Sequence, residues 1–569
     1  MPLVDTKNPL VHLLLLIRLI CVFYSIIPDC DEVFNYYEPL NFLLRGFGKQ
    51  TWEYSPEYAI RSWAYLIPYA IPTYPVTVAI DYFKILPPQA AFYTIRLSVV
   101  SFTLYSELHL YNTLKQKVNL SIANYYLFFT SVSTGLSHAS IALLPSSFAM
   151  NCTALATSNL IQYFHSRNLG YALLVTFWFI TGGVIGWPFV LALAAVSTLV
   201  IIAQNLKSFL ITRRYIGWSF FIVLVIIGTS LQIDSTFYAK TVLVPANIVL
   251  YNVIFADENA GPNIFGVEPL SYYIINLLLN FNIIAILGYI GIIAVPVLSF
   301  TGLKPNKLSN LEIITILSPI AVWSGIFFSQ PHKEERFLYP IYSTINLSAA
   351  FTLWYVSKTI SCITQSITKS SKSSSIFKSI IVSTILILTF IISLSKTASL
   401  SNNYSAPLEI YNSLPRNESG NVCVGREWYR YPSSFFLSQN QRLNFIKTNF
   451  NGLLPGDFNE TIGKFQSIRI IPENMNNLNK FEPSKLSNFE NCDYAIDISQ
   501  PVDSETEEIG FLNEQGEIRK GWELIKSVPF LNNDESEGIG RLLWIPKQFF
   551  QLTKTKLTYH SYNLYKKVE

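Results

Sequence analysis

The sequence predicts an α-helical polytopic membrane protein of about eleven transmembrane helices, followed by a soluble C-terminal domain. The chain has 569 residues and is 50% hydrophobic and 15% aromatic. Only 14% of its residues are charged, whereas an average soluble protein carries roughly 25%. The apolar residues gather into runs of membrane-spanning length, for which about 20 residues suffice. The composition therefore excludes an ordinary cytosolic enzyme.

The apolar runs give the order of the expected spans. They cover residues 10–28, 90–112, 122–138, 146–164, 169–185, 187–204, 215–232, 270–297, 311–329, 337–357 and 379–395. The first run also resembles a signal peptide, but it ends without the small-x-small pattern of a cleavage site, which favours an uncleaved span. Residues 62–86 contain three prolines that would break or kink a spanning helix, so we expect this stretch to lie along one membrane face. The Ser/Lys-rich residues 365–378 predict a solvated cytoplasmic linker.

The charged residues of the loops predict the orientation of the chain, because short cytoplasmic loops collect Lys and Arg. With a cytoplasmic N-terminus, the cytoplasmic loops contain basic but no acidic residues: Lys115, Lys117, Arg167, Lys207, Arg213, Arg214, Lys304, Lys307, Lys358, Lys369, Lys372 and Lys378. The opposite loops contain the carboxylates Asp29, Asp31, Glu32, Glu38, Glu53, Glu57, Asp234, Asp257, Glu258, Glu268, Glu334 and Glu335. If residues 62–86 crossed the membrane, the downstream basic loops would fall on the wrong side.

After Lys396 the sequence becomes polar and rich in Asn and Glu. We therefore expect a multi-span domain at 1–396, with a first non-cytoplasmic loop at 29–61, and a soluble domain at 397–569 on the same non-cytoplasmic side. Cys423 and Cys492 are the only cysteines of the soluble domain, and an oxidising compartment is compatible with a disulfide between them, while two free thiols are an equal alternative. The domain also carries glycosylation sequons at Asn403, Asn417 and Asn459.

The usual catalytic motifs are missing from the sequence. We find no GxxxxGK[ST], HExxH, GxSxG or GxGxxG motif, and the six histidines are scattered singly. The net charge of +4 and the lack of a basic cluster interleaved with aromatic residues indicate no nucleic-acid partner, and favour a lipid-borne one. The ionisable residues of the non-cytoplasmic loops are therefore the candidates for a site.

The first candidate is the acidic and aromatic loop directly after the first span. Asp31 and Glu32 lie near its start, and a carboxylate close to an apolar surface has a raised proton affinity that suits a general base. Aromatic rings beside these carboxylates would suit a sugar face, while the alternative is an interfacial aromatic belt with solvated charges. Asp29-Cys30-Asp31 has the Asp-x-Asp form of metal-dependent nucleotide-sugar transferases, but the loop faces away from the cytosol where such donors are made. We therefore expect no metal.

The second candidate is a run of five consecutive ionisable residues, 332–336, between two apolar spans. Such a run at a membrane boundary is costly unless its members are paired or used. His332, Lys333 and Arg336 are suitable donors for a lipid phosphate, and a self-paired cluster is the alternative. A third stretch, which includes Tyr251 and Glu268, is either a substrate-lining loop or an ordinary turn-rich connection.

At these motifs the chain resembles a known family, the dolichyl-phosphate-mannose-dependent α-1,2-mannosyltransferases of the endoplasmic reticulum that build the lipid-linked oligosaccharide for asparagine-linked glycosylation. The segments that carry the resemblance are Asp31 to Leu40, Thr51 to Tyr58, Gly186 to Phe189, Asp234 to Lys240, Asn247 to Asn252, His332 to Pro340 and Val422 to Arg430. The chain departs from the family pattern at Val267, where Thr is commoner, and at Leu270, where an aromatic residue is frequent.

The resemblance implies a GT-C fold with a lumenal α/β domain at its C-terminus. It also implies an inverting transfer of mannose from dolichyl-phosphate mannose to dolichyl-pyrophosphate-linked acceptors with six and eight mannoses, without a cofactor. Asp31, with Glu32 as alternate or helper, would deprotonate the acceptor hydroxyl. His332, Lys333 and Arg336 would stabilise the developing phosphate charge. The residues expected to bind substrate are Asn35, Tyr36, Glu38, Trp52, Tyr251, Glu268 and Glu335.

Three alternatives stay open at this point. His-Lys-Glu-x-Arg-Phe also occurs in related mannosyltransferases of glycolipid-anchor synthesis. A transporter or flippase for a lipid phosphate would place ionisable residues at mid-membrane and often shows two related halves, and we find no internal repeat. A non-catalytic assembly subunit would not need an acidic first loop together with a basic later one.

Overall fold

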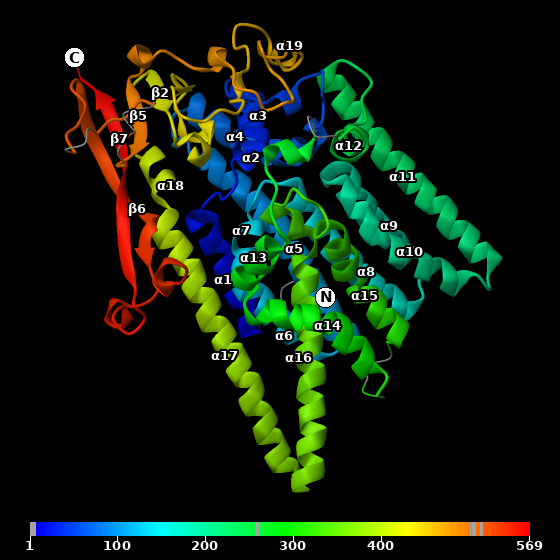
Figure 1. Ribbon diagram of the computed structural model, residues 1–569. Helices are drawn as coiled ribbons and strands as arrows, with labels where there is room; N and C mark the ends of the chain where they lie inside the picture. The colour runs from blue at the N-terminus through cyan, green and yellow to red at the C-terminus, as the bar shows by residue number, and fades with distance from the viewer. Residues whose placement is uncertain are drawn as a thin grey trace. The chain divides into compact units, whose positions relative to one another are not determined.

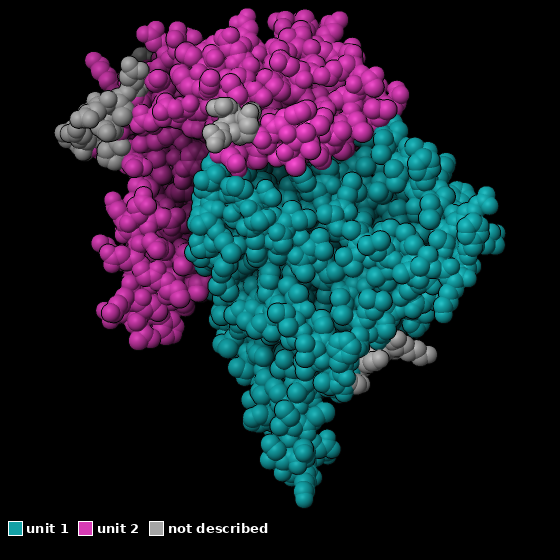
Figure 2. Space-filling view, turned by 45° about the vertical axis from the view of Figure 1, so that its right-hand side comes forward, with its two compact units in different colours: residues 1–21, 100–230, 266–396 teal, residues 22–99, 231–265, 397–569 magenta. Residues whose placement is uncertain are grey.

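The computed structural model describes residues 7–256, 261–301, 303, 305, 308–500, 502, 508–512 and 516–568. The loop residues Asp257, Glu258, Lys304 and Lys307 lie outside this description. The chain forms two compact units, which Figure 2 shows in different colours. Unit 1 comprises residues 1–21, 100–230 and 266–396, and unit 2 comprises residues 22–99, 231–265 and 397–569. One boundary between the units thus falls after Lys396, but unit 2 also includes two earlier segments.

Unit 1 is helical, and its helices form where the apolar runs predict them (Figure 1). They are α1 (Pro9–Tyr24), α5 (Ala90–Lys117), α6 (Leu120–Val132), α7 (Thr134–Ala139), α8 (Pro145–Ser166), α9 (Leu169–Thr181), α10 (Leu191–Asn205), α11 (Phe209–Tyr238), α13 (Leu270–Phe281), α14 (Ile283–Ser299), α15 (Asn310–Phe327), α16 (Tyr339–Thr368) and α17 (Ser371–Tyr404). Four of these, α1, α5, α11 and α17, continue into unit 2. The predicted helical membrane architecture is therefore confirmed.

Fewer helices than expected are apolar throughout. Among the described residues, five segments are long and apolar enough to cross a membrane: Leu169–Gly186, Pro188–Asn205, Phe209–Tyr238, Asn310–Phe327 and Ser371–Tyr404. A sixth is added if α13 and α14, which meet at a bend of 116°, count as one span. Helices such as α5, α8 and α16 also carry polar side chains, and several of these are buried within unit 1, among them Thr103, Ser106, Asn151, Thr153, Asn346 and Ser348. Hydrogen bonds to neighbouring helices make such residues tolerable inside a membrane bundle.

Three expectations about irregular segments were incomplete or wrong. The prolines of residues 62–86 do not break the helix there, since α4 (Trp63–Asp81) contains all three. The predicted linker 365–378 is largely helical, because α16 ends at Thr368 and α17 begins at Ser371. The predicted span 270–297 is interrupted at Asn282, which has a positive φ of 43° and caps α14 with its side chain.

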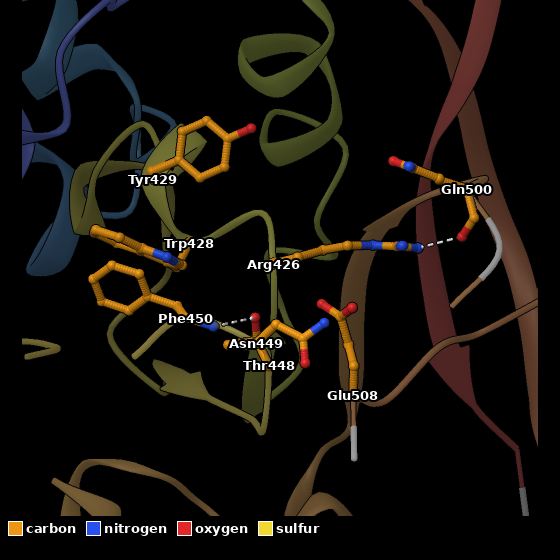
Figure 3. Close-up of a pocket in the computed structure, with 8 residues that line it drawn as sticks. All are labelled: Arg426, Trp428, Tyr429, Thr448, Asn449, Phe450, Gln500 and Glu508. Atoms are coloured by element: carbon orange, nitrogen blue, oxygen red, sulfur yellow. Dashed lines mark hydrogen bonds between the residues drawn. The ribbon is translucent and has the colours of Figure 1, made fainter. Parts of the chain in front are cut away.

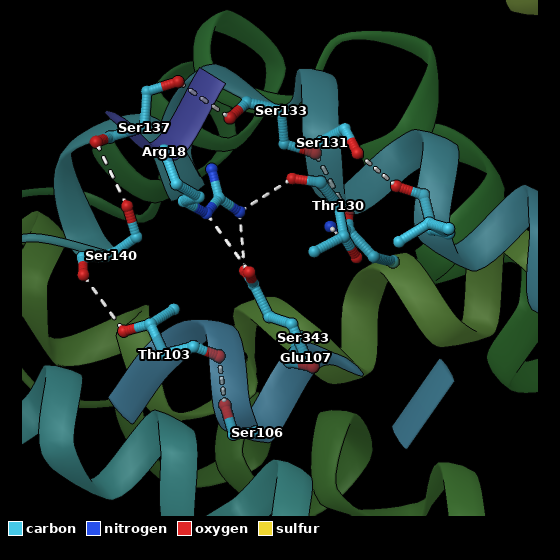
Figure 4. Close-up of polar contacts among 12 residues, drawn as sticks. Arg18, Thr103, Ser106, Glu107, Thr130, Ser131, Ser133, Ser137, Ser140 and Ser343 are labelled. Atoms are coloured by element: carbon cyan, nitrogen blue, oxygen red, sulfur yellow. Dashed lines mark hydrogen bonds and ion pairs between the residues drawn. The ribbon is translucent and has the colours of Figure 1, made fainter. Parts of the chain in front are cut away.

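A buried ion pair lies inside the predicted spans of unit 1 (Figure 4). Arg18 of α1 donates from Nη2 to Glu107 Oε1 of α5 at 2.5 Å and to the Thr130 carbonyl of α6 at 2.9 Å. Both side chains are almost completely excluded from solvent, and a charge in that position is costly unless it is paired. The pair therefore holds α1 against α5 and α6.

The C-terminal part of unit 2 contains a five-stranded mixed sheet of order β3-β2-β5-β7-β6. Its strands are β2 (Gly420–Val424), β3 (Gln441–Phe445), β5 (Tyr494–Ile498), β6 (Trp522–Glu537) and β7 (Lys556–Lys567). Strand β2 is parallel to both β3 and β5, and β7 is antiparallel to both β5 and β6. Unit 2 also contains α4, already described, and the elements α2 (Cys30–Glu32), α3 (Glu38–Arg45), α12 (Val244–Val249), α18 (Ala406–Tyr411), α19 (Lys464–Ile468) and the paired strands β1 (Lys49–Gln50) and β4 (Gly456–Asp457).

The structure decides between the two states of the cysteine pair that the sequence left open. Cys423 of β2 is bonded to Cys492, which lies just before β5, and the bridge is buried among aromatic side chains of the domain core. Of the three sequons, those at Asn417 and Asn459 have exposed asparagines. Asn403 is only 6% exposed and its side chain is bonded to Ser399 and Tyr559, so the folded domain leaves no room for a glycan there.

Candidate active site

The segment that follows the first predicted span is helical rather than a loop. Helix α2, a π-helical turn at Val33–Tyr37 and α3 form a continuous run from residue 30 to residue 45. The side chain of Asp29 begins this run by accepting a hydrogen bond from the Asp31 backbone N–H at 2.9 Å. Asp31 is half-buried at the start of the run, while Glu32 is 2% exposed. A π-turn inside a helix is frequent at functional sites.

Arg61 is a cation of this site that the sequence did not reveal. Its guanidinium donates from Nε and Nη2 to Glu53, at 3.1 and 2.7 Å, and from Nη1 to the Tyr36 hydroxyl at 3.0 Å. Burial alone would lower the pKa of Arg61, but the negative charges of Glu53 and Asp31 raise this pKa above its ordinary value. Asp31 therefore lies in the field of a fixed positive charge.

The backbone around Arg61 is fixed by three side chains from distant parts of unit 2. The Tyr238 hydroxyl donates to the Arg61 carbonyl at 2.6 Å, and Asn247 Nδ2 donates to the carbonyls of residues 58 and 59. The fully buried carboxylate of Asp234 accepts from the Ser62 hydroxyl and the residue 64 N–H, so it caps α4. The stretches around 234–240 and 247–252 thus position the Arg61 segment.

Two of the predicted substrate residues, Asn35 and Tyr36, lie in this run, and two others, Trp52 and Tyr251, pack against each other. Asn35 is buried and accepts from the Thr51 hydroxyl at 2.7 Å, and Tyr36 contacts Arg61 as described. Trp52 packs against Tyr251, with ring centroids 5.2 Å apart, so the structure brings together two residues that are far apart in the sequence. Trp52 and Tyr251 thus form an aromatic pair within unit 2.

Glu38 is completely buried and connects the first segment to the C-terminal domain. Its carboxylate accepts from Ser434 N at 2.6 Å, Ser434 Oγ at 2.7 Å and Lys49 N at 2.9 Å. Burial raises the pKa of Glu38 above its ordinary value, although these hydrogen bonds oppose the shift. The oxygens of Glu38 are thus occupied by protein donors, which gives this residue a positioning role.

In unit 1, the ionisable run that follows α15 is arranged around Glu334. His332 Nε2 lies 3.0 Å from Glu334 Oε1, and Arg336 Nε forms an ion pair with the other carboxylate oxygen. Burial would raise the pKa of Glu334, but Arg336 and His332 lower it to about 2. Burial would lower the pKa of His332, but Glu334 and the carbonyl of Gly266 raise it above its ordinary value. Glu334 therefore keeps two cations side by side.

Lys333 is held by backbone carbonyls of two neighbouring segments. Its ammonium group donates to the Glu268 carbonyl at 2.9 Å and to the Gln330 carbonyl, and the Glu268 N–H donates to the Pro331 carbonyl at 3.0 Å. Lys333 is 7% exposed, whereas the Glu268 side chain is exposed. These contacts join the segment before α13 to the ionisable run.

Glu335 accepts three hydrogen bonds within unit 1, and the sequence predicted none of them. The donors are His138 Nε2 at 2.7 Å, Asn280 Nδ2 at 2.9 Å and the Tyr342 hydroxyl at 3.1 Å. Burial would raise the pKa of Glu335, but the interaction with His138 and these hydrogen bonds lower it. His138 had seemed one isolated histidine among six, and no local pattern marks its partner.

An aromatic cluster holds the end of the ionisable run. Trp187 packs against Trp323, Phe327 and Phe337, with ring centroids 5.2 to 5.5 Å apart. The indole N–H of Trp323 donates to the Phe337 carbonyl at 2.7 Å. The Gly186 to Phe189 motif therefore supports the segment that carries Arg336.

The acidic start of the first helical run also has the donor atoms of a metal site. Asp29, Cys30 and Asp31 offer ligand atoms within 4.8 Å of one another. The carboxylate of Asp29 is already engaged as a helix cap, and a cluster of this kind is common without an ion. We assign no metal to it.

Comparison with known proteins identifies the family. Residues 10–438 match the Alg9-like mannosyltransferase family. The chain belongs to this family. Alpha-1,2-mannosyltransferase ALG9 of Saccharomyces cerevisiae is 36% identical over 562 residues, covering 95% of this chain and 93% of the relative. Its human counterpart is 33% identical over 557 residues, covering 94% of this chain and 85% of the relative. The resemblance seen in the motifs is thus confirmed.

Solved structures are more distant. The apo structure of ArnT from Cupriavidus metallidurans has a TM-score of 0.48 and 10% identity, with coverage of 78% of this chain and 85% of ArnT. The family assignment does not depend on this likeness. The structure describes two sets of charged groups in this chain: carboxylates beside Arg61 in unit 2, and paired cations around Glu334 in unit 1.

Proposed function

We propose that this protein transfers mannose in α-1,2 linkage from dolichyl-phosphate mannose to dolichyl-pyrophosphate-linked oligosaccharides in the lumen of the endoplasmic reticulum. The acceptors are the six- and eight-mannose intermediates of asparagine-linked glycosylation. The family assignment and the names of the curated relatives support mannosyl transfer. The observation that carries the proposal is the placement of Asp31 and Glu32 at the start of a helical run that lies within the field of Arg61.

Asp31 is the proposed general base. Its carboxylate takes the proton of the acceptor 2-hydroxyl as that oxygen attacks C1 of the donor mannose, and the bond from C1 to the phosphate oxygen breaks. The attack on the opposite face inverts the β-linked donor to an α product. The leaving group departs as dolichyl phosphate and needs no proton. Glu32 is buried next to Asp31 and serves as its helper.

The cations of the ionisable run are proposed to bind the phosphate of the donor. Phosphate gains charge as the bond to C1 breaks, and fixed positive groups stabilise that charge more in the transition state than in the ground state. Glu334 holds His332 and Arg336 together and favours the protonated imidazole. Lys333 adds a third positive charge that is fixed by backbone carbonyls.

The proposal is tested by reconstituting the purified protein in vesicles with dolichyl-phosphate mannose and a six-mannose lipid-linked acceptor. We expect a product with one more mannose that an α-1,2-specific mannosidase removes. An extra mannose in another linkage would refute the assigned linkage. No transfer from dolichyl-phosphate mannose, combined with transfer from a nucleotide sugar, would refute the assigned donor.

A further inference from the structure

The C-terminal domain contains a pocket that the proposed reaction does not use. It has a volume of about 450 Å³, within the range of roughly 300 to 1,000 Å³ that is typical of ligand pockets. Figure 3 shows the side chains that line it. They are Arg426, Trp428, Tyr429, Thr448, Asn449, Phe450, Gln500 and Glu508.

The topology of the sheet explains why a pocket forms here. Strands β2, β3 and β5 are parallel, so their carboxyl ends meet at one edge of the sheet. The lining residues follow the ends of these strands at 424, 445 and 498. From β2 the chain proceeds first to β3 on one side and later to β5 on the other. Such a reversal of strand order opens a crevice beyond the strand ends, where ligands bind in open sheets.

The lining has an aromatic side and a polar side. Trp428 and Phe450 lie next to each other with ring centroids 4.6 Å apart, and Arg426 extends away from them toward Gln500 (Figure 3). Asn449 and Glu508 add amide and carboxylate groups between these two sides. A sugar ring has an apolar face of C–H bonds and a rim of hydroxyls, and an aromatic wall next to fixed polar groups matches both.

The polar side is rigid and close to neutral. Arg426 donates to both oxygens of Asp497, at 2.8 and 3.0 Å, and to the carbonyls of Ile498 and Gln500. Its charge is thus balanced by Asp497, and the nearby Glu508 makes the pocket unfavourable for an anion such as phosphate. The polar groups are equally unsuited to a lipid chain. The lining therefore favours an uncharged ligand with many hydroxyl groups.

The pocket is also connected to the helical run that carries Asp31. The Trp428 ring lies 6.0 Å from the ring of Phe34, which is in the π-turn three residues after Asp31. Tyr431, which follows the pocket residues Trp428 and Tyr429 in the chain, stacks on the same Phe34 ring with a centroid distance of 6.1 Å. Both contacts lie within unit 2, so a ligand on Trp428 is held by the same packed cluster as the proposed base.

We propose that this pocket binds mannose residues of the oligosaccharide acceptor, and that it recognises a branch other than the one that receives the new mannose. This inference rests on the proposed function, because it takes the acceptor to be a branched mannose oligosaccharide. A separate pocket that binds mannose branches already present on the acceptor would allow one catalytic site to use two acceptors of different size.

The test compares two lipid-linked acceptors, the six-mannose oligosaccharide and a truncated one that retains only the receiving branch. Asn449→Ala and Trp428→Ala should each lower the ratio of kcat/KM for the six-mannose acceptor to that for the truncated acceptor by roughly tenfold, the effect of about one lost hydrogen bond or ring contact. Asn451→Ala is the matched control, because Asn451 is exposed, close in sequence and outside the pocket lining. An unchanged ratio in the Asn449 variant would overturn the proposal, whatever the Trp428 variant does to folding.

A binding measurement separates this proposal from the proposed function. The released six-mannose glycan is titrated into full-length Asp31→Asn protein without donor, and tryptophan fluorescence is followed. Saturable quenching that Asn449→Ala weakens supports the pocket even if the transferase assay fails. Transfer by the wild type, together with no glycan-dependent change in this titration and no change in the acceptor ratio, overturns the pocket and leaves the proposed function standing.

Discussion

The interaction of His138 with Glu335 gives a sharp prediction about how the cationic run is positioned. Glu335 accepts three hydrogen bonds, and the one from His138 is the shortest at 2.7 Å. The side chains are 9% and 22% exposed, so solvent replaces a lost partner poorly. A hydrogen bond to a charged group contributes about 1.5 to 3 kcal/mol. Because Glu335 directly precedes Arg336, His138→Ala should displace the donor-binding cations and raise the KM for the donor by roughly 10- to 100-fold.

The assay is mannosyl transfer in vesicles at varied donor concentration, with saturating acceptor. His138→Gln keeps an amide donor near the carboxylate and should recover part of the loss. His165→Ala is the matched control, since His165 is an exposed histidine at the end of α8. A double-mutant cycle with Glu335→Gln should give non-additive effects on donor KM. If the effects of the two single variants on donor KM, expressed as free energies, sum to the effect of the double variant within about 0.5 kcal/mol, the proposed coupling of the two residues is refuted.

Three further predictions concern other parts of the chain. The raised pKa of His332 means that its favourable interaction with Glu334 is present at pH values below the ordinary pKa and is lost as the pH rises through the raised one. Glu334→Gln should therefore make donor KM rise at a lower pH than in the wild type, and an unshifted profile would contradict this. Arg18→Ala should lower the free energy of unfolding by about 3 to 5 kcal/mol, whereas the double variant Arg18→Met with Glu107→Leu should recover most of this loss. The measurement is thermal unfolding, and equal decreases in Tm for the single and the double variant would contradict the account of Arg18 and Glu107 as a buried ion pair. The two exposed C-terminal sequons should carry glycosidase-sensitive glycans, and cleavage of the domain by protease added outside sealed microsomes would contradict its lumenal placement.

The helical architecture was predictable because a membrane requires long apolar segments, which are visible locally in the sequence. The disulfide was recognisable as a candidate because only two cysteines lie in the soluble domain, but the sequence left bonded and free thiols equally open. The scarcity of charge likewise drew attention to Asp31 and to the run at 332–336. What these observations share is that each depends on composition or on neighbouring residues.

The missed features depend on partners that are distant in the sequence. Arg18 and Glu107 are 89 residues apart, and His138 and Glu335 are 197 residues apart, so no local pattern connects them. Arg61 was only one of three basic residues in the first segment, and its position is set by hydrogen bonds from residues beyond 230. The helix from 30 to 45 was also missed, because polar and aromatic residues with a proline at 39 are typical of an interfacial loop.

The central claim is that Asp31 is the base that activates the acceptor hydroxyl. It is tested most directly by transfer of mannose from dolichyl-phosphate mannose to the six-mannose acceptor by Asp31→Asn, with Asp29→Asn as the control for the neighbouring helix cap. Both variants should show thermal unfolding close to that of the wild type. We predict that Asp31→Asn lowers kcat by about 10²- to 10⁴-fold, the usual contribution of a general base, and that Asp29→Asn has a much smaller effect. A folded Asp31→Asn protein with full kcat would contradict the assignment.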